Sequence, residues 1–284
     1  MFQIKYIFIL TALITAGMMA AYGQSNWSIN PSLQYASGNY LSDQRLNSWY
    51  LYGGVRYETN AYSVSLSIPF IASNGQNVSQ FGNIYIPNHM GSGSSGMGIM
   101  GGHSGGHMPG NESLLTSSST ENYGIGDLYL YANYNIINPF TSSLGLSASG
   151  YIKFPTASTA NGFGTGKFDL SLSAAVRKSI GTFILYGSGG YIFLGDPDSL
   201  DYFNPFIFDL GIGKSFNNGN LSVLLNYNLY TKILDVYQPP QQLSLGININ
   251  SNERIKYICI LSAGLSDSAP DYVLSAGIKY NLSD

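Results

Sequence analysis

Alternation of apolar and polar residues at every second position dominates this chain. Residues 62–70 read YSVSLSIPF, with an apolar residue at each even position and Ser or Pro at each odd one. The same pattern recurs in the segments 27–35, 128–136, 144–154, 168–176, 221–229, 243–249 and 272–282. A period of two gives a β-strand one apolar and one polar face. We therefore predict an all-β fold.

Twelve such strands can be placed along the chain, and most are 10 to 12 residues long. Strands of soluble sheets average about 5–6 residues, whereas a tilted strand that crosses a membrane needs about 9–11. The predicted strands are 27–36, 47–58, 62–71, 125–136, 144–154, 167–178, 182–193, 204–215, 221–230, 241–250, 255–264 and 271–282. Segments 204–215 and 255–264 alternate least cleanly. An even count suits a closed barrel whose two ends lie on the same side of the membrane.

Aromatic residues stand eight positions apart on the apolar face of several strands. The pairs are Trp27 with Tyr35, Trp49 with Tyr57, Tyr62 with Phe70, Phe183 with Tyr191, and Tyr272 with Tyr280. Eight residues of a tilted strand rise roughly 20 Å, close to the roughly 25 Å apolar band and aromatic girdles of outer-membrane barrels. We predict a transmembrane antiparallel up-and-down β-barrel of about 12 strands that contacts the lipid bilayer. The core of a secreted sandwich is the alternative.

Composition and the first residues agree with an exported protein. Charged residues make up 10% of the chain, against about 25% in soluble domains, and the net charge of −3 gives no basic footprint for nucleic acid. Lys5, the apolar run 6–16, and the small residues Ala21 and Gly23 have the order of a secretory signal peptide. We predict a signal peptide at 1–23 and a barrel at 24–284, in the outer membrane of a Gram-negative-type bacterium. A retained membrane anchor is the alternative.

The connections between strands alternate between short and long. Residues 59–61 and 217–219 form short turns, and the longest connection, at about 72–123, is rich in Gly, Ser, Met and His. Short periplasmic turns and long external loops are typical of these barrels. The strand count therefore predicts one long extracellular loop at about 72–123.

This loop holds the residues of the chain best suited to bind a soft metal ion. It contains all three histidines and four of the seven methionines, namely His89, Met90, Met97, Met100, His103, His107 and Met108. Thioether sulfur favours Cu(I), and imidazole suits copper, zinc and nickel. We expect the loop to bind copper or silver, while the barrel itself requires no cofactor. Another metal, or a flexible segment that binds nothing, are the alternatives.

Charged and tyrosine side chains share the polar face of three central strands, which in a barrel is the lumen. They are Asp127, Tyr129, Tyr131, Tyr151, Lys153, Asp169 and Arg177. Charges of both signs on adjacent strands predict a network that either props the interior or lines a path for permeation. The sequence shows no His on a predicted strand and no paired carboxylates at a cleft, so we do not expect an enzyme.

Two stretches carry a family resemblance. Residues 124–134 read GIGDLYLYANY, and residues 151–171 read YIKFPTASTANGFGTGKFDLS. Gly-x-Gly-Asp, then Lys-x-Pro-Thr, Gly-Thr-Gly and Asp in this order resemble the outer-membrane transporter family named for the MetA pathway of phenol degradation, over roughly residues 120–284. Ala157 stands where that family usually has Gly. The resemblance implies an outer-membrane barrel with small hydrophobic compounds as cargo.

The leading functional hypothesis is an outer-membrane transporter or channel for a small solute, with a loop that captures copper-like ions. One alternative is a channel for hydrophobic or aromatic compounds whose loop is only a flexible lid. Another is a structural or adhesive surface barrel that conducts nothing. The cargo of the leading hypothesis is a small molecule or a metal ion.

Overall fold

The structure is a computed structural model that describes residues 27–40, 45–75, 78–88, 117–139, 141–198 and 200–282. Its strands are β1 (Trp27–Ile29), β2 (Ser32–Gly38), β3 (Leu46–Glu58), β4 (Tyr62–Gly75), β5 (Val78–Phe81), β6 (Ile84–Pro87), β7 (Ser117–Ile125), β8 (Leu128–Ile137), β9 (Leu144–Phe154), β10 (Asp169–Ile180), β11 (Phe183–Phe193), β12 (Phe206–Phe216), β13 (Leu221–Tyr230), β14 (Gln241–Asn250), β15 (Ile255–Gly264) and β16 (Tyr272–Asn281). Two 3-10 turns, η1 (Thr159–Asn161) and η2 (Asn217–Gly219), complete the elements. No helix among these residues is long and apolar enough to cross a membrane.

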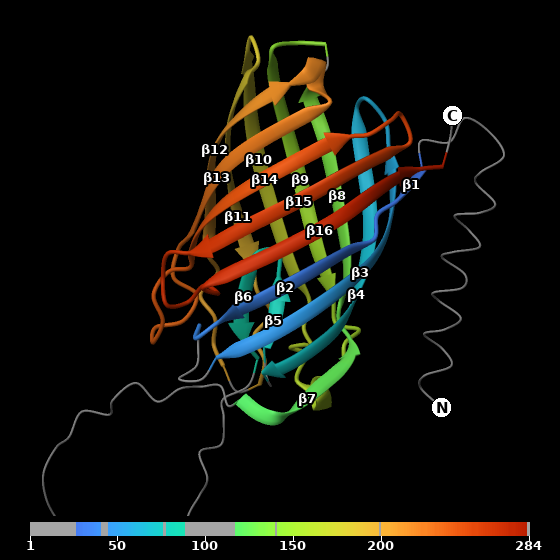
Figure 1. The fold of residues 1–284 in the computed structure, drawn as a ribbon. Coiled ribbons are helices and arrows are strands. Elements are labelled where there is room, and N and C mark those ends of the chain that lie inside the picture. Colours follow the sequence, from blue (N-terminus) through green and yellow to red (C-terminus); the bar gives the residue numbers. More distant parts are fainter. Residues whose placement is uncertain are drawn as a thin grey trace, which may run out of the picture.

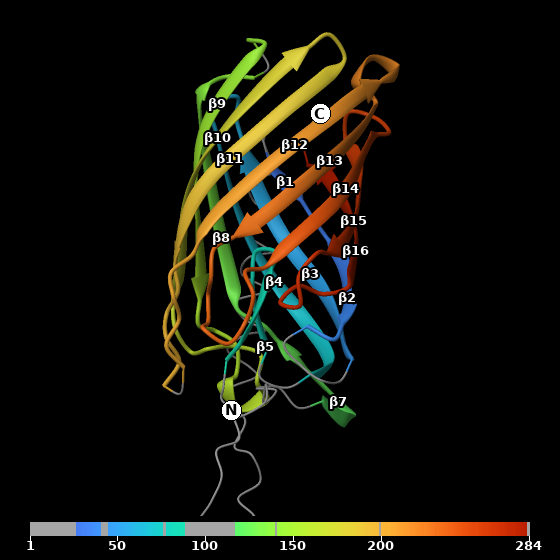
Figure 2. The ribbon, with the colours of Figure 1, turned by 90° about the vertical axis from the view of Figure 1, so that its left-hand side faces the viewer.

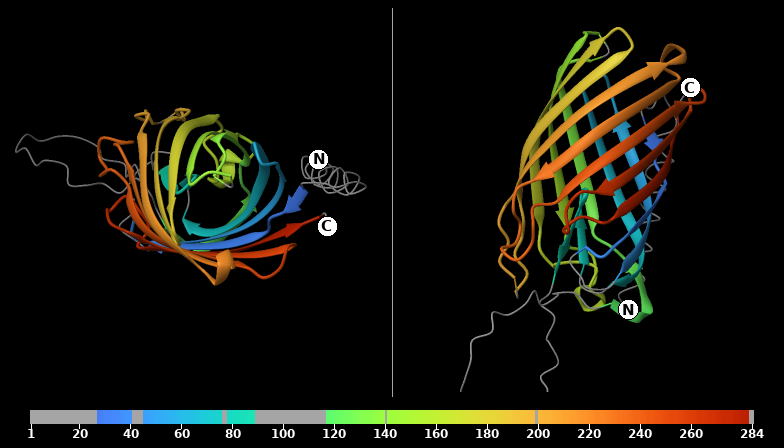
Figure 3. Two further views of the ribbon diagram at one scale, coloured as in Figure 1. Left: turned by 90° about the horizontal axis from the view of Figure 1, so that it is seen from above. Right: turned by 60° about the vertical axis from the view of Figure 1, so that its left-hand side comes forward.

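One antiparallel sheet closes on itself into a barrel (Figures 1 and 3). β1 and β2 together form its first strand, interrupted at Pro31, and β7 and β8 together form its fourth. The other ten strands are continuous, so the barrel has the twelve strands that the alternation predicts. β16 pairs with β1 and β2, and β3 pairs with β4, which leaves every strand with two hydrogen-bonded neighbours. The bilayer core demands this closure because it offers backbone groups no water.

The two ends of the barrel differ. Ser28 of β1 pairs with Asn281 of β16, so the first and last strands finish at the same end, at the top of Figure 1. The short turns 59–61, 181–182 and 217–220 lie at this end, and the longer connections lie at the other. We name the first end periplasmic and the second extracellular, following the arrangement usual for such barrels.

The outer face carries exposed aromatic side chains at both ends of the barrel. Trp49, Phe70 and Phe206 lie exposed toward the extracellular end, and Phe183 and Phe216 toward the periplasmic end. At the periplasmic end Lys214 Nζ lies 5.1 Å from the ring centre of Phe183 and 5.2 Å from that of Phe216. A cation that reaches past aromatic rings to the water interface is typical of the edge of an apolar band.

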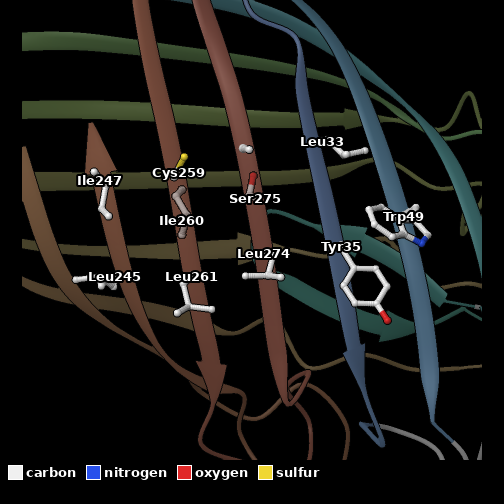
Figure 4. A pocket seen from close by; sticks show the side chains of 11 residues that line it. Leu33, Tyr35, Trp49, Leu245, Ile247, Cys259, Ile260, Leu261, Leu274 and Ser275 are labelled. Atoms are coloured by element: carbon white, nitrogen blue, oxygen red, sulfur yellow. The ribbon is translucent and has the colours of Figure 1, made fainter. Parts of the chain in front are cut away.

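A shallow apolar groove crosses the outer wall over β14, β15, β16, β2 and β3 (Figure 4). Leu245, Leu261, Leu274, Tyr35 and Trp49 lie in register across these strands. The smaller Cys259 and Ala276 form the adjacent row. This groove faces the bilayer, and Cys259, the only cysteine, is exposed there.

The long connection after β4 differs from the expected external loop. β4 continues to Gly75 and pairs with β7, so both edges of the predicted 72–123 loop are strand. β5 and β6 form a hairpin inside the extracellular half of the barrel (Figures 2 and 3). The connection lies at the extracellular end as predicted, but its described parts are not an open loop, because 78–87 form a hairpin whose apolar residues are buried inside the lumen. Residues 89–116 and the predicted signal peptide at 1–23 lie outside the described residues.

Two equally exposed residues test whether the barrel lies in a bilayer. Leu210 in the middle of β12 is 66% exposed, and Val236 in the β13–β14 connection is 67% exposed. We expect Leu210→Arg to lower the free energy of unfolding by about 2–4 kcal/mol, because the charge would face lipid near the midplane. Val236→Arg should change it by about 0.5 kcal/mol or less, because that loop faces water. Urea unfolding in lipid vesicles, followed by tryptophan fluorescence, measures both. Equal effects would argue against a membrane-embedded wall.

Candidate functional site

The hairpin of residues 78–88 fills the centre of the extracellular half and is bound to the wall by polar side chains. Gln34 Nε2 donates to Tyr85 Oη at 2.7 Å. Tyr52 Oη donates to Gln80 Oε1 at 2.8 Å, and Tyr129 Oη donates to the Gln80 carbonyl at 2.8 Å. Three separate strands of the wall, β2, β3 and β8, thus contact one hairpin.

Further contacts surround the rest of the hairpin. Phe81 meets Tyr151 edge-on with ring centres 4.8 Å apart. Gln242 Nε2 donates to the Asn83 carbonyl at 3.2 Å, and Tyr202 Oη, from an extracellular loop, donates to the Pro87 carbonyl. Burial raises the pKa of the Tyr202 phenol, so it stays protonated as a donor. Together with the bonds above, these contacts join the hairpin to β2, β3, β8, β9, β14 and the β11–β12 loop.

An ion cluster lies beside the hairpin. Lys153 Nζ is 2.5 Å from Asp169 Oδ2, 3.7 Å from Asp127 Oδ2 and 3.1 Å from Thr165 Oγ1. The side chains of Lys153, Asp127 and Asp169 are at most 1% exposed. A buried lysine of this kind is tolerated only because its charge is matched and hydrogen-bonded. We call Lys153, Asp127, Asp169 and Thr165 the Lys153 cluster.

The Lys153 cluster fixes the extracellular loops. Asp127 Oδ1 accepts a hydrogen bond from the Ala157 backbone at 2.8 Å. Asp169 Oδ1 accepts one from the Gly195 backbone at 2.9 Å. A Cβ on Gly164 would lie 3.2 Å from both Asp127 carboxylate oxygens and 2.8 Å from the Ala157 Cβ, so only glycine fits there. Asp127, Lys153, Thr165 and Asp169 come from the motifs that carry the family resemblance. These motifs therefore meet in one place, where they join β8, β9 and β10 to the loops at Ala157 and Gly195.

The predicted lumen residues separate into two places. Asp127, Lys153 and Asp169 form the cluster, and Tyr129 stacks on Tyr151 next to the hairpin, with ring centres 5.4 Å apart. Arg177 faces the lumen in the periplasmic half and forms no ion pair within the described part of the chain. Tyr131 shares the inward face of β8 with Tyr129.

The predicted metal ligands lie outside the described residues. They are His89, Met90, Met97, Met100, His103, His107 and Met108. Among the residues that the structure describes, no group of three or more His, Cys, Asp or Glu side chains could hold a metal. Copper or silver binding by the loop thus stays a prediction.

The hairpin residues were missed by the sequence interpretation, although a signal was present. Gly82 and Asn83 separate the short segments VSQF and IYIP, and a two-residue turn with Gly first is a hairpin signature. Gly82 has φ +59°, a conformation that glycine adopts without strain. Nothing in the sequence, however, indicates that the hairpin would turn into the lumen.

The closed barrel, with its apolar outer wall and its filled extracellular half, defines an outer-membrane-type β-barrel protein. The chain matches the family described as "Putative MetA-pathway of phenol degradation" over residues 90–282, and it belongs to this family. The match begins about thirty residues before the segment that carries the resemblance, at roughly residue 120, and it includes the loop from Met90 onward. Comparison with curated proteins gives no match.

Several solved structures share this fold. The COG4313 outer membrane channel from Pseudomonas putida F1 has a TM-score of 0.60 at 12% identity and covers 91% of this chain and 96% of its own. The NanC porin has a TM-score of 0.51 at 9% identity, with 89% and 99% covered. The translocator domain of the autotransporter NalP from Neisseria meningitidis has a TM-score of 0.50 at 9% identity, with 97% and 96% covered. At these identities the likeness shows the fold.

Removing the buried lysine should be costly. We expect Lys153→Met to lower the free energy of unfolding by about 3–5 kcal/mol, because two buried carboxylates would lose their counter-charge. The control is Arg45→Met, which breaks the half-exposed pair with Asp271 and should cost less than about 1 kcal/mol. Adding Asp127→Asn and Asp169→Asn to Lys153→Met should recover much of the loss. Unfolding in vesicles measures all three variants, and a small effect of Lys153→Met would contradict the structural role of the cluster.

Proposed function

We propose that this protein is an outer-membrane channel that admits small hydrophobic or aromatic compounds, with the hairpin 78–88 controlling passage. The observation that carries the proposal is the aromatic interior around the hairpin. The side chains packed there are Tyr40, Tyr50, Tyr85, Phe81, Tyr202 and Tyr230, together with aliphatic residues of the wall and loops. Surfaces of this kind suit flat apolar solutes, which aromatic faces bind through offset and edge contacts.

The charges of the extracellular half support this solute class. Lys153 is bound to two aspartates and all three side chains are buried, so its charge is neutralised within the protein and does not face a solute. Toward the periplasmic end, Glu58 binds both Arg56 and Lys279. Passage of a highly charged solute through the extracellular half would need free charges of one sign there, and the Lys153 cluster is paired instead. Membership in a family named for phenol degradation agrees with an aromatic cargo.

The position of the hairpin indicates how passage would be controlled. Residues 78–81 and 84–88 are buried, whereas the turn residues Gly82 and Asn83 are exposed. The turn therefore borders open space in the periplasmic half, while the legs of the hairpin occupy the extracellular half. In this proposal a solute enters when the hairpin contacts to Tyr52, Tyr129 and Gln242 open. Export by the predicted signal peptide would deliver the barrel to the outer membrane.

Two measurements test the proposal together. Intact Gram-negative cells that express the protein should take up N-phenyl-1-naphthylamine, an apolar fluorescent probe, faster than cells with an empty vector.

The second measurement is ion conductance in planar bilayers. The native protein should show low conductance, and deletion of 78–88 should raise it several-fold, because the extracellular half would lose its filling. The control is Val236→Arg in the β13–β14 connection, a 67% exposed position, and this variant should keep the conductance low. No added uptake of the probe would contradict the proposed cargo, and unchanged conductance after the deletion would contradict the role of the hairpin.

We further propose that the loop segment from His89 to Met108 binds copper or silver ions near the channel mouth. The support is compositional: this segment holds every histidine of the chain and no other segment after residue 23 holds a methionine. Titration of the full chain with Cu(I) against a competing chelator tests it. A variant with Met→Leu and His→Ala at the seven positions should bind at least about tenfold more weakly. Equal binding by both chains would rule out the loop as a metal site.

A further inference from the structure

Strand β15 departs from the alternation of the rest of the barrel. Its sequence reads IKYICILSAG, with apolar residues on both faces. Ser262 faces the lumen, because its Oγ lies 2.8 Å from that of Ser244, on the same inward face as Gln242, which reaches the hairpin. Ile260 and Ile258 lie two and four residues before Ser262, on the same face of the strand. The pairing of β15 with both neighbouring strands shows no register shift that would change this face. Both isoleucines therefore point into the lumen.

These two side chains are unusual because they are exposed there. Ile258 is 38% exposed and Ile260 is 39% exposed. The other large apolar residues that are exposed on described strands face the bilayer. Their direct inward partners on β14 and β16 are small or polar: Gly246 and Ser275 flank Ile260, and Asn248 and Gly277 flank Ile258. Apolar area that stays in contact with water inside a lumen is unfavourable unless something covers it.

The surroundings leave room for an occupant. A Cβ on Gly246, the partner of Ile260 on β14, would meet only the Leu224 carbonyl, at 3.8 Å, so the space in front of it is open. We call the side chains of Ile258 and Ile260 the isoleucine patch. Two of their cross-strand partners, Gly246 and Gly277, add no side chain to it. Ile260 lies four residues before Gly264 on β15. Gly264 pairs with Gln242, which donates to the hairpin turn, so the patch lies close to the hairpin along this wall. It is thus the first apolar surface below the hairpin turn on this wall.

We infer that Ile258 and Ile260 form a binding surface for a small apolar hydrocarbon after it has passed the hairpin. The inference rests on the proposed function, and it adds a named site to it. The lumen position excludes lipid and selects an occupant that travels through the barrel. The open space at Gly246 gives a flat ring access to Ile260, and Ile258 lies two residues further along the same inward face. Such a surface would hold the solute weakly and release it toward the periplasm.

A single reporter thiol tests the site. Cys259→Ser removes the only native cysteine, and Gly246→Cys then places one thiol beside Ile260 in open space. In proteoliposomes, saturating naphthalene should slow modification of this thiol by a charged methanethiosulfonate about tenfold, because a bound ring would cover it. The control is Ser147→Cys, which faces the lumen from β9 on another part of the wall and should react at an unchanged rate.

The isoleucines are tested by substitution in the same background. Ile258→Ser combined with Ile260→Ser should abolish the protection, whereas Ile184→Ser, an inward isoleucine on β11, should leave it unchanged. Equal protection at Ser147→Cys, or protection that survives loss of both isoleucines, would overturn the inference. So would absence of protection in a protein that still takes up N-phenyl-1-naphthylamine, and that result would leave the proposed function intact. Loss of uptake in the native protein would instead contradict the proposed function itself.

Discussion

Closure of the backbone hydrogen bonds is the constraint on which the whole molecule depends. β16 pairs with β1 and β2, and β3 pairs with β4, so the barrel has no free edge among the described strands. Without that closure, edge groups in a bilayer would lack partners. In a closed sheet, alternate residues of each strand face either the bilayer or the lumen. On β12, Leu210 therefore faces outward while its neighbour Asp209 faces the lumen.

The second determinant is the Lys153 cluster. Its three charges come from β8, β9 and β10 or their ends, and their remaining hydrogen bonds fix the loops at Ala157 and Gly195. Asn88, at the end of the hairpin, donates to the Gly162 carbonyl at 2.9 Å in the same region. The cluster therefore supports the hairpin from the side, and the tyrosines of the wall orient it. A filled extracellular half and an open periplasmic half follow from this arrangement.

The barrel could be predicted from the sequence because one face of each strand meets lipid and the other meets the lumen, which gives the alternation of apolar and polar residues. The even count, the outward aromatics and most strand bounds follow from that pattern, whereas β4 and β7 extend beyond the predicted 62–71 and 125–136 because they pair with each other at the extracellular end. The inward position of Asp127, Lys153 and Asp169 also follows, but their meeting does not, because it depends on register between strands. The hairpin could not be placed in the lumen, since the sequence of 78–87 indicates a turn at Gly82 and Asn83 but not which side of the barrel wall the hairpin packs against. The imperfect alternation of 255–264 was visible in the sequence, and only the register of β15 shows that Ile258 and Ile260 face the lumen.

In the proposed mechanism, solutes pass only when the hairpin 78–88 leaves its contacts with the wall. A Cys259→Ser chain that carries Asn83→Cys and Gln242→Cys would place two thiols at the hairpin turn and the facing wall. A short bis-methanethiosulfonate cross-linker can join them, and a reducing agent can release them. We expect cross-linking to stop uptake of N-phenyl-1-naphthylamine by intact cells and reduction to restore it. Uptake that continues unchanged in the cross-linked protein would contradict the account.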